Sequence, residues 1–544
     1  MSCFFQQYRP LILSLFCGII LTLFTQGCKE TLSGVQRENL PPKTYLWTDT
    51  VGVVQTSRVR FFWWGNDPDG IVQGYLVTLD GTQWTWTTSQ ESTFTVHLGG
   101  VETLLAQFRV AAVDMEGNGR RDASVSAGGI NFGPEPFDDL DSNGVYSTGE
   151  PFVDFGAIDP DPPRLQVLIK NSAPTVSFVN NTGIPAQTLP VATFLFQGTD
   201  VDGNETIVRY FIALNDTSEA SWTEIPGTVS MVTLSGDLSN SSATTVSAKV
   251  FAGTGLTDLG LTVSGLRLDA PNVLYLFCED LAGARSKVTR MPDTTRTWLV
   301  KKPVGRRNLL LVDDYATASP NPDDVYRVAL QSAVDGSGQS FGDYDVLDLR
   351  TYPLPAPIHK PMLVQTFRAY KTVFWYARIA DLNFAQNSLP EFMATGGKVL
   401  MTTGFQNFVD PLGLPLDFAP LDNLITSYVD SAGNSVSGFI SRVYLNGKVL
   451  SEDSSSYPPM VFDRDALFGT YAVIPAPGHQ VVYKLDLPKN PPNTQERWVG
   501  TPAVGVRSQD GRIFFFTMPL HLLNTVDPID NRSRLVKFFE SVLR

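Results

Sequence analysis

Apolar and polar residues alternate in short segments from residue 45 onward, and this pattern predicts β-strands. Each segment is bounded by Gly, Asp or Asn. An alternation of period two places one face of a strand in a core, and turn residues at this spacing are typical of an antiparallel sandwich. The segments of this kind before residue 114 are 58–64, 71–79, 83–87, 93–98 and 107–113.

The pattern then occurs a second time. Residues 64–70 (WGNDPDG) recur as 197–203 (QGTDVDG), each after an aromatic strand and before a strand with a central Tyr. Internal repetition predicts two modules of one fold, which we place at 45–172 and 173–303. They resemble the fibronectin type III or immunoglobulin-like modules of bacterial surface proteins, and the resemblance implies architecture only. The Asp-x-Asp-Gly of each copy predicts a tight turn or, alternatively, a metal site.

The hydrophobic pattern changes after a basic link at 302–307. Continuous apolar strands, such as 308–312 and 398–403, alternate with segments of helical period. Strands that are apolar throughout are typical of parallel sheets covered on both faces. The predicted fold class is therefore multidomain: two antiparallel β-sandwiches followed by an α/β domain at 304–544 with a flavodoxin-like, mostly parallel sheet. Helices are expected at 325–333, 389–394 and 534–543, and further strands at 344–349, 372–376 and 512–517.

An apolar run at residues 11–24 follows a single basic residue. The run is shorter than the about 20 residues that a membrane-spanning helix needs, and it has the length and flanks of a secretory signal. Gly27-Cys28 after it resembles the lipobox of bacterial lipoproteins. The resemblance implies a signal peptide at 1–27, a lipid on Cys28 and a tether at 28–44. An ordinary signal peptide with an incidental Cys is the alternative, and both would export the mature chain.

Charge and cysteine usage narrow the choice of partners and compartment. The 544 residues carry a net charge of −14 without a basic patch, so nucleic acid is not an expected partner. Of the four cysteines, Cys3 and Cys17 would leave with the signal and Cys28 would carry the lipid. Cys278 then remains alone, and the mature chain would have no internal disulfide. Its apolar strand favours a core position, with a reactive thiol as the alternative.

Residues 139–150 (DLDSNGVYSTGE) match the twelve-residue calcium loop at each constrained position. Oxygen-bearing side chains stand at places 1, 3, 5, 9 and 12, a backbone carbonyl is offered at 7, and Gly144 stands at the sharp turn at 6. A hard cation prefers such a set of oxygens. We therefore predict structural Ca²⁺ here, with an acidic turn as the alternative. The predicted ligands are Asp139, Asp141, Asn143, the Val145 carbonyl, Ser147 and Glu150.

Glu-Pro-Phe occurs on both sides of this loop, at 135–137 and 150–152. Proline disfavours a continuing helix, so we expect no paired helices like those of a calcium sensor. The segment resembles the isolated EF-hand-like calcium loops of extracellular bacterial proteins. An ion in it would brace the insertion at 135–154, which has no disulfide to hold it.

The order of elements over 308–544 resembles the class I glutamine amidotransferase-like fold. Members place a nucleophilic Cys after a strand like 398–403 and a His-Pro-Glu after a late strand. Those places fall here at Thr403, Met518 and Leu520, and only the Pro is kept. This domain contains no Cys, and a Thr hydroxyl without an adjacent base is a poor nucleophile. The comparison therefore implies a domain without this catalytic apparatus.

Asp313 and Asp314 end the first strand of this domain. The strand resembles that of response-regulator receivers, in which an acidic pair binds magnesium. The strand at 372–376, however, is followed by Ala-Arg where that family needs a phosphorylatable Asp. At the carboxyl edge of a sheet, where ligands of open α/β folds bind, the two carboxylates would line a polar pocket with Arg378 and His521. The alternatives are helix capping by the acidic residues and a core position for His521.

These inferences favour an exported, lipid-anchored envelope protein at the outer membrane or cell surface. The β-sandwich modules would present a non-catalytic α/β domain that binds a glycan or an envelope protein, or that acts only as a scaffold. Trp84 and Trp86 are candidates for stacking on sugar rings, with core packing as the alternative. A divergent envelope hydrolase or amidase is the second hypothesis, and its catalytic residues would be Asp313, Asp314, Thr403 and His521.

Overall fold

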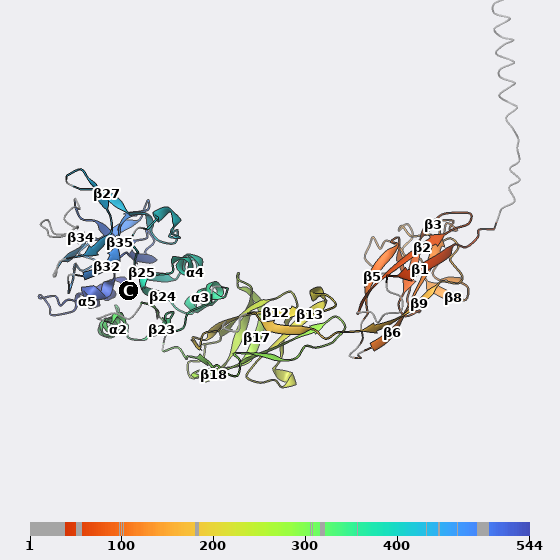
Figure 1. Cartoon of the computed structure of the whole chain (residues 1–544), viewed down its shortest axis with the longest axis horizontal. Coiled ribbons are helices and arrows are strands. Elements are labelled where there is room, and N and C mark those ends of the chain that lie inside the picture. Colours follow the sequence, from red (N-terminus) through yellow and green to blue (C-terminus); the bar gives the residue numbers. More distant parts are fainter. Residues whose placement is uncertain are drawn as a thin grey trace, which may run out of the picture. The chain divides into compact units, whose positions relative to one another are not determined.

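β-Strands are the main regular structure of the described residues, and the described α-helices all follow residue 320 (Figure 1). The computed structural model describes residues 38–49, 57–96, 98, 101, 103–179, 184–304, 306, 308–315, 321–355, 357–407, 409–430, 432–443, 447–464, 466–486 and 500–544. The predictions for the signal peptide and Cys28 lie outside these residues. Among the helices described, none is long and apolar enough to cross a membrane. The chain divides into two compact units. The first consists of Met1–Val96 and Thr103–Lys170, and the second consists of His97–Glu102 and Asn171–Arg544.

The first unit contains the antiparallel strands that the alternating pattern predicts. One sheet has the order β1 (Lys43–Thr48), β2 (Arg58–Asn66), β5 (Glu91–Thr95), and the other β4 (Thr85–Thr87), β3 (Val72–Thr78), β6 (Thr103–Asp114), β9 (Arg164–Lys170). Every second residue of β2 from Val59 to Trp63 is buried. Phe61 of β2 stacks on Phe108 of β6 with ring centroids 4.2 Å apart, so the two sheets share one core.

The predicted insertion lies between β6 and β9. Trp84 packs on Phe132 with ring centroids 4.7 Å apart, and Trp86 packs on Phe155 at 4.9 Å. Both tryptophans are half-buried against these residues, which stand on either side of the insertion in the sequence, so the structure favours the core alternative for them over stacking on sugars. The hairpin of β7 (Val125–Ala127) and β8 (Ile130–Gly133) precedes the insertion.

The strands after residue 171 repeat the first arrangement. The N–H of Gly65 donates to the hydroxyl of Tyr75 at 3.1 Å, and the N–H of Gly198 donates to the hydroxyl of Tyr210 at 3.1 Å. Each glycine and each tyrosine occupies the same place in its sequence repeat, so the internal repeat is also a structural one. A five-stranded sheet contains β10 (Thr175–Phe178), β12 (Val191–Thr199), β15 (Met231–Gly236), β16 (Thr245–Ala252) and β17 (Thr257–Arg267). A four-stranded sheet contains β14 (Thr223–Pro226), β13 (Ile207–Leu214), β19 (Leu274–Asp280) and β20 (Thr289–Met291), and a smaller one β11 (Gln187–Thr188), β21 (Trp298–Val300) and β18 (Ala270–Asn272).

A core fills the space between these sheets. It includes Phe196, Ile212, Val250 and Leu276, which come from both the five-stranded and the four-stranded sheet. Cys278 is fully buried in the same core, as expected for a small apolar residue. Burial raises the pKa of its thiol, which disfavours the reactive thiolate.

A nine-stranded sheet follows in sequence, and it is mixed. The strands β23 (Tyr344–Asp348), β22 (Leu309–Asp314), β24 (Thr372–Ile379), β25 (Lys398–Gly404) and β36 (Ile513–Phe516) pair in parallel in this order. The ladder continues in the antiparallel sense through β35 (Ala503–Arg507), β34 (Gln480–Asp486), β30 (Lys448–Ser451) and β31 (Met460–Val461). The prediction of a mostly parallel sheet is therefore wrong for half of the ladder, and the flavodoxin-like α/β assignment is not confirmed. Among the described residues from β30 to β36 there is no α-helix that could connect successive strands as a parallel crossover.

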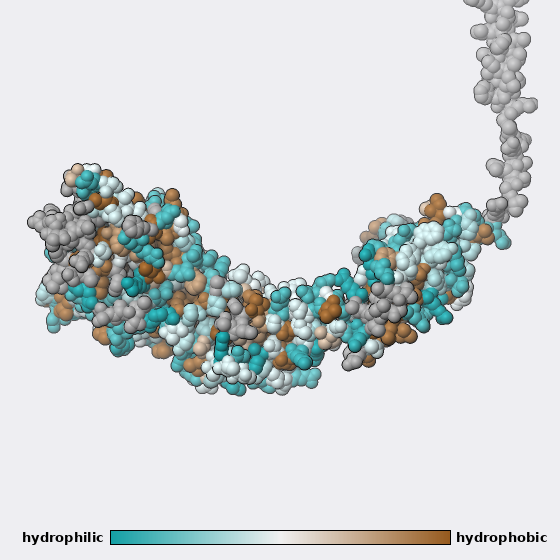
Figure 2. Space-filling model, viewed as in Figure 1, coloured by the Kyte–Doolittle hydropathy of each residue, from teal (hydrophilic) through white to brown (hydrophobic). Residues whose placement is uncertain are grey.

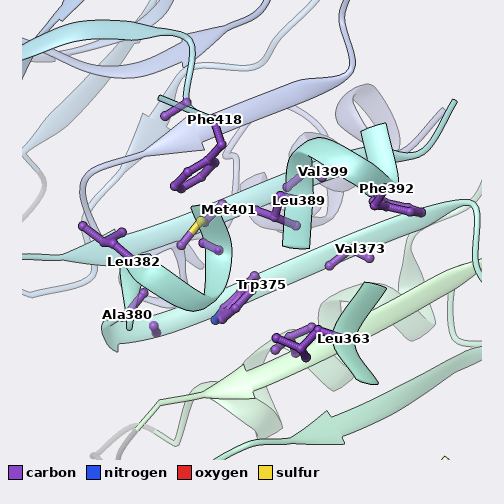
Figure 3. Close-up of a cluster of buried hydrophobic side chains, with 14 of the residues drawn as sticks. Leu363, Val373, Trp375, Ala380, Leu382, Leu389, Phe392, Val399, Met401 and Phe418 are labelled. Atoms are coloured by element: carbon purple, nitrogen blue, oxygen red, sulfur yellow. The ribbon is translucent and has the colours of Figure 1, made fainter. Parts of the chain in front are cut away.

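The helices pack their apolar sides on this sheet. Figure 3 shows Leu363 of α3 and Leu389 of α4 beside Trp375 and Met401 of the central strands, in one buried cluster. The helices expected at 325–333, 389–394 and 534–543 are confirmed with shifted ends, and α3 was not predicted. The α-helices among the described residues are α2 (Pro322–Ser332), α3 (His359–Phe367), α4 (Leu382–Ala394) and α5 (Arg534–Val542).

Each described sheet stays within one part of the sequence, 43–170, 175–300 or 309–516. This is compatible with three domains, whose boundaries at 45–172, 173–303 and 304–544 stay predictions. Hydrophilic and hydrophobic residues are interspersed on the face that Figure 2 shows.

Candidate functional site

The loop at residues 139–150 folds around its own carboxylates. The Gly144 N–H donates to Asp139 Oδ2 at 2.7 Å, and the Leu140 N–H donates to Glu150 Oε1 at 3.0 Å. Gly144 has a φ of 76°, in the left-handed region that glycine enters without strain. The hydrogen bond from Gly144, more than any other contact, lowers the pKa of Asp139. The backbone thus closes the loop and favours the ionised form of Asp139.

Three of these carboxylates converge. Asp139, Asp141 and Glu150 each bring an oxygen within 4.8 Å of the other two, a grouping able to hold a metal ion. Asn143 Nδ2 donates to Asp141 Oδ2 at 2.7 Å, and Ser147 Oγ donates to the same oxygen at 3.3 Å. The five predicted side-chain ligands therefore lie together, and the arrangement is chemically suited to a hard divalent cation.

The base of the loop is held by aromatic and backbone contacts. Phe137 and Phe152 face one another in an antiparallel bridge, and the ring of Tyr146 lies against both, with centroids 5.6 and 6.0 Å away. The guanidinium of Arg121 lies 4.8 Å from the rings of Phe137 and Tyr146. The buried carboxylate of Glu135 accepts the N–H groups of Asp122 and Phe155 at 2.7 Å each. The two Glu-Pro-Phe segments therefore close the loop, without flanking helices.

Sequence reasoning missed an exposed row of aromatic side chains on the outer side of β1 and β2. Tyr45, Trp47 and Trp64 are 48%, 46% and 46% exposed. Tyr45 stacks on Trp64 with centroids 5.5 Å apart, and Trp47 stacks on Phe62 at 6.0 Å. Both pairs are direct cross-strand neighbours. We refer to Tyr45, Trp47, Phe62 and Trp64 as the aromatic face.

Polar groups border the aromatic face. The guanidinium of Arg60 lies 4.9 Å from the ring of Phe62 and pairs with Glu91 at 2.6 Å. Thr93 and Thr95 of β5 are exposed on the same side of the sheet. The signal was present in the sequence, since 58–64 carries aromatic residues at both odd and even positions and a strand can bury only one of these sets.

The side chains of Asp313 and Asp314 do not form a pair, because adjacent residues of β22 project to opposite faces of the sheet. Asp313 accepts the N–H of Tyr315 at 3.1 Å, whereas Asp314 accepts Nε1 of Trp375 at 3.3 Å. Burial raises the pKa of Asp313 to about 7 and that of Asp314 to about 6. The N-cap of α2 is Asn321, so the prediction that these acidic residues cap that helix is wrong.

Thr403 and His521 are also separated. Thr403 lies on the same face as Met401, where its hydroxyl accepts the Ala380 N–H at 2.9 Å and donates to the Gly404 carbonyl at 2.9 Å. His521 is fully buried, with its ring 5.1 Å from that of Tyr315, and burial lowers its pKa to about 4. Asp313 and His521 thus share one face of the sheet and Thr403 lies on the other. The structure brings the four residues to no common centre and favours a core position for His521.

A cavity of about 850 Å³ opens at the opposite edge of the sheet, where β22, β24 and β25 begin. It is separate from Asp313 and His521, which lie toward the carboxyl ends of the parallel strands. Its lining includes Asn308, Arg368, Lys371, Thr372, Lys398 and Arg544.

Neither a family model nor a curated protein matches the chain. Among solved structures, it is similar to the fibronectin(III)-like modules of Clostridium thermocellum CbhA, at 12% identity, over 47% of this chain and 94% of that one, with a TM-score of 0.17. It is similar to a ThuA-like protein from Bacteroides uniformis, at 12% identity, over 43% and 91%, with a TM-score of 0.27. A third is the Bacteroides ovatus glucan-utilization protein SGBP-B in complex with a mixed-linkage heptasaccharide, at 12% identity, over 48% and 71%, with a TM-score of 0.10. Scores this low establish no shared fold or function.

Proposed function

We propose that this chain is an exported, lipid-anchored protein of the outer membrane or cell surface that binds a glycan without catalysis. Residues 1–27 are the signal peptide, and Cys28 carries the lipid. Two β-sandwich modules then connect the anchor to a degenerate amidotransferase-like α/β domain. The observation that carries the binding role is the exposed aromatic face.

The aromatic face has the chemistry that sugar recognition requires. A sugar ring offers an apolar C–H face that packs on an aromatic ring, and its hydroxyls need polar groups at the edge. Tyr and Trp combine a large apolar ring with a polar tip, and Arg60 and Glu91 supply charged hydrogen-bonding groups beside Phe62. Cross-strand stacking accounts for the pairing of the rings, but not for leaving three large rings about half exposed. Exposed apolar groups rimmed by polar ones are typical of binding sites.

The absence of catalysis is proposed from the separation of the candidate residues. The Thr403 hydroxyl is already engaged by two backbone groups. His521 is neutral at physiological pH because of its low pKa, and it is fully buried. A nucleophile must lie within hydrogen-bond reach of its base, and these residues project from opposite faces of the sheet. A binding or scaffold role is the simpler account.

We also propose that Ca²⁺ occupies the loop at residues 139–150 as a structural ion. The loop closes an insertion that is also held by the aromatic cluster at Tyr146, by the buried Glu135 and by Asp154, which accepts the N–H groups of Asn118 and Gly119. Neutralising Asp139, Asp141 and Glu150 would relieve the repulsion among carboxylates held within 4.8 Å. Extracellular modules bind Ca²⁺ at about 10⁻⁴–10⁻³ M, which suits a brace better than a sensor.

The glycan proposal is tested by affinity electrophoresis of the purified chain in gels that contain soluble β-glucan, xylan, mannan or peptidoglycan fragments. Trp47→Ala and Trp64→Ala should each weaken binding by about 2 kcal/mol, or roughly thirtyfold in Kd, because each removes a central stacking ring. Leu105→Ala is the control, since Leu105 is an exposed apolar residue on the other sheet of the module. Retardation that all variants share, or none with any glycan, would refute the role of the aromatic face.

The anchor is tested by labelling cells with an alkyne fatty acid and fractionating the envelope. We expect label and membrane association for the wild type and for the control Cys278→Ser, and neither for Cys28→Ser. Label that survives in Cys28→Ser, or an unlabelled chain in the cytosol, would contradict the lipoprotein assignment.

The hydrolase alternative keeps one supporting observation. A carboxyl with a pKa of about 7, such as Asp313, is suited to general acid–base chemistry near neutral pH. Hydrolysis of an envelope glycan or amide by the wild type that is lost in Asp313→Asn, while binding is kept, would replace the non-catalytic proposal.

A further inference from the structure

Four buried side-chain oxygens before the loop at 139–150 have no hydrogen-bond partner among the described residues. One is Gln73 Oε1, and the other three are Asn39 Oδ1, Asp67 Oδ2 and Asp114 Oδ2. Asp114 is 0% exposed, and its other oxygen, Oδ1, accepts the N–H of Glu116 at 2.7 Å. A buried carboxylate oxygen without a partner is strongly unfavourable unless a cation or a proton balances it.

The segments that carry these oxygens meet at one end of the module. Asp114 is the register partner of Val72, and the Met115 N–H donates to the Ile71 carbonyl at 3.0 Å, so Asp114 lies beside the turn that follows β2. That turn contains Asp67 and Asp69. The Leu40 N–H donates to Asp69 Oδ2 at 3.2 Å, which ties the chain at Asn39 to the same turn.

The charges of this end also interact. Burial raises the pKa of Asp67, and the nearby charge of Asp114 raises it further. No cationic side chain is among the main causes of that shift, and the donors to Asp67 are the backbone N–H groups of Asp69 and Gly70. This end of the module therefore holds two interacting carboxylates that no cationic side chain is shown to balance.

In the second module both equivalent carboxylates accept a hydrogen bond from another side chain, although Asn171 Oδ1, like Asn39 Oδ1, has no partner among the described residues. Asn171, Asp200 and Asp280 stand at the equivalent places, with Asp280 opposite Ile207 as Asp114 is opposite Val72. Here Asp200 Oδ2 accepts the Thr206 hydroxyl at 3.1 Å, and Asp280 Oδ2 accepts Asn171 Nδ2 at 2.8 Å. The Thr206 carbonyl accepts the Leu281 N–H at 2.8 Å, as the Ile71 carbonyl accepts that of Met115, so Thr206 and Ile71 are equivalent. Ile71 has no hydroxyl to donate.

We propose that the first module binds a Ca²⁺ ion between Asn39, Asp67 and Asp114, and that the second module does not. Two carboxylates and an amide carbonyl form an all-oxygen set of the kind that Ca²⁺ prefers, with water completing the coordination. In the second module the hydroxyl and the amide N–H₂ take the place of the cation. Because Asn39 precedes β1 directly, the ion would fasten the end of the predicted tether to the module.

The test is calorimetric titration of the detergent-solubilised full chain with CaCl₂ after treatment with EDTA. Asp139→Asn/Glu150→Gln serves as the parent, since it disables the loop at 139–150. The parent should bind one Ca²⁺, and adding Asp67→Asn should weaken this binding at least about tenfold. Adding Asp200→Asn instead, at the equivalent place of the second module, should leave affinity and stoichiometry unchanged. A parent that binds no Ca²⁺, or equal effects of the two substitutions, overturns the proposal.

A second measurement separates loss of a ligand from loss of structure. Asp67→Asn keeps the shape of the side chain and removes one of two neighbouring negative charges. In EDTA the variant should therefore melt at the same temperature as the parent or higher, and Ca²⁺ should raise the melting temperature of the parent only. A variant that melts lower in EDTA and still responds to Ca²⁺ assigns Asp67 a structural role and overturns the proposal. These readouts do not depend on glycan binding, so the two proposals can fail separately.

Discussion

Replacing Asp313 by Asn should stabilise the C-terminal sheet at neutral pH. Asp313 is 2% exposed, and burial raises the pKa of its carboxyl from 3.8 to about 7. The folded domain therefore keeps a proton between pH 3.8 and about 7 that the unfolded chain has lost, so stability falls as the pH rises through this window. At 1.36 kcal/mol per pKa unit, the ionised carboxylate costs about 4 kcal/mol above pH 7. Arg350, 3.7 Å away, already opposes part of the shift.

Asn removes this pH-dependent loss while preserving the local geometry. Its Oδ1 can still accept the Tyr315 N–H, which Asp313 accepts at 3.1 Å. At pH 4 the Asp313 carboxyl is protonated and neutral, so the substitution there should change stability by no more than about 1 kcal/mol. The difference between Asp313→Asn and the wild type should therefore grow by about 4 kcal/mol between pH 4 and pH 8.

Hydrogen exchange of the amides of Leu309–Asp314 is a suitable assay, because β22 pairs on both sides and its amides exchange only when the sheet opens. After correction for intrinsic exchange, protection in Asp313→Asn at pH 8 should exceed that of the wild type by roughly a thousandfold. Asp324→Asn is the control, since that carboxylate is exposed on α2. Asp314 and His521 titrate in both proteins and cancel from the comparison. If the difference is the same at pH 4 and pH 8, the carboxyl has an ordinary pKa and the reasoning from burial is wrong.

Burial lowers the pKa of His521 from 6.5 to about 4, so the C-terminal domain should lose about 3 kcal/mol of stability as the pH falls from 6.5 to 4. In His521→Leu the same exchange assay should show no such loss, and a pH dependence equal to that of the wild type would contradict this. Tyr210→Phe should destabilise the second module by about 1 kcal/mol by removing the acceptor of the buried Gly198 N–H, and Tyr75→Phe should do the same to the first. If only one substitution lowers the thermal unfolding temperature, the two equivalent hydrogen bonds do not contribute equally to stability. Chelation with EGTA should expose residues 139–150 to limited proteolysis, and Glu150→Gln should show the same cleavage without chelator. If neither EGTA nor the substitution changes the rate of cleavage, the loop is only an acidic turn.

Period-two patterning predicted the strands of the modules because their burial alternates residue by residue, as in β2. It could not predict the direction of pairing in the C-terminal sheet. β34 and β35 are as apolar as the parallel strands, and whether such strands run parallel depends on the connection between them, not on their own composition. The helix α3 was missed because six of its nine residues are buried, and a helix that is buried nearly all round has no amphipathic period to detect.

The candidate sites differ in how far the sequence predicts them. The loop at 139–150 draws all of its proposed ligands from twelve consecutive residues, so spacing alone is informative. Asp313 and Asp314 are adjacent in a strand, and the same period of two that revealed the strand could have shown that they face opposite ways. The aromatic face could not be predicted from local spacing, because both sides of β2 carry aromatic residues and the sequence does not say which side a second sheet covers. Pairing with β1 and packing on Phe108 decide this, and both are long-range.

The comparison of the two modules favours a binding site in the first module over one in the C-terminal domain. Sequence reasoning assigned binding to the C-terminal domain, since its strand ends carry the acidic residues. The structure divides those residues between two faces of a sheet, whereas the aromatic face, the loop at 139–150 and the unpartnered oxygens of Asp67 and Asp114 all belong to the first module. In the second module the equivalent carboxylates are satisfied by Thr206 and Asn171. The position equivalent to Tyr45 in that module is Ser177 of β10, opposite Gln197, and neither can stack. The glycan site that we propose therefore lies in the module that directly follows the predicted tether, and the later modules would extend from it.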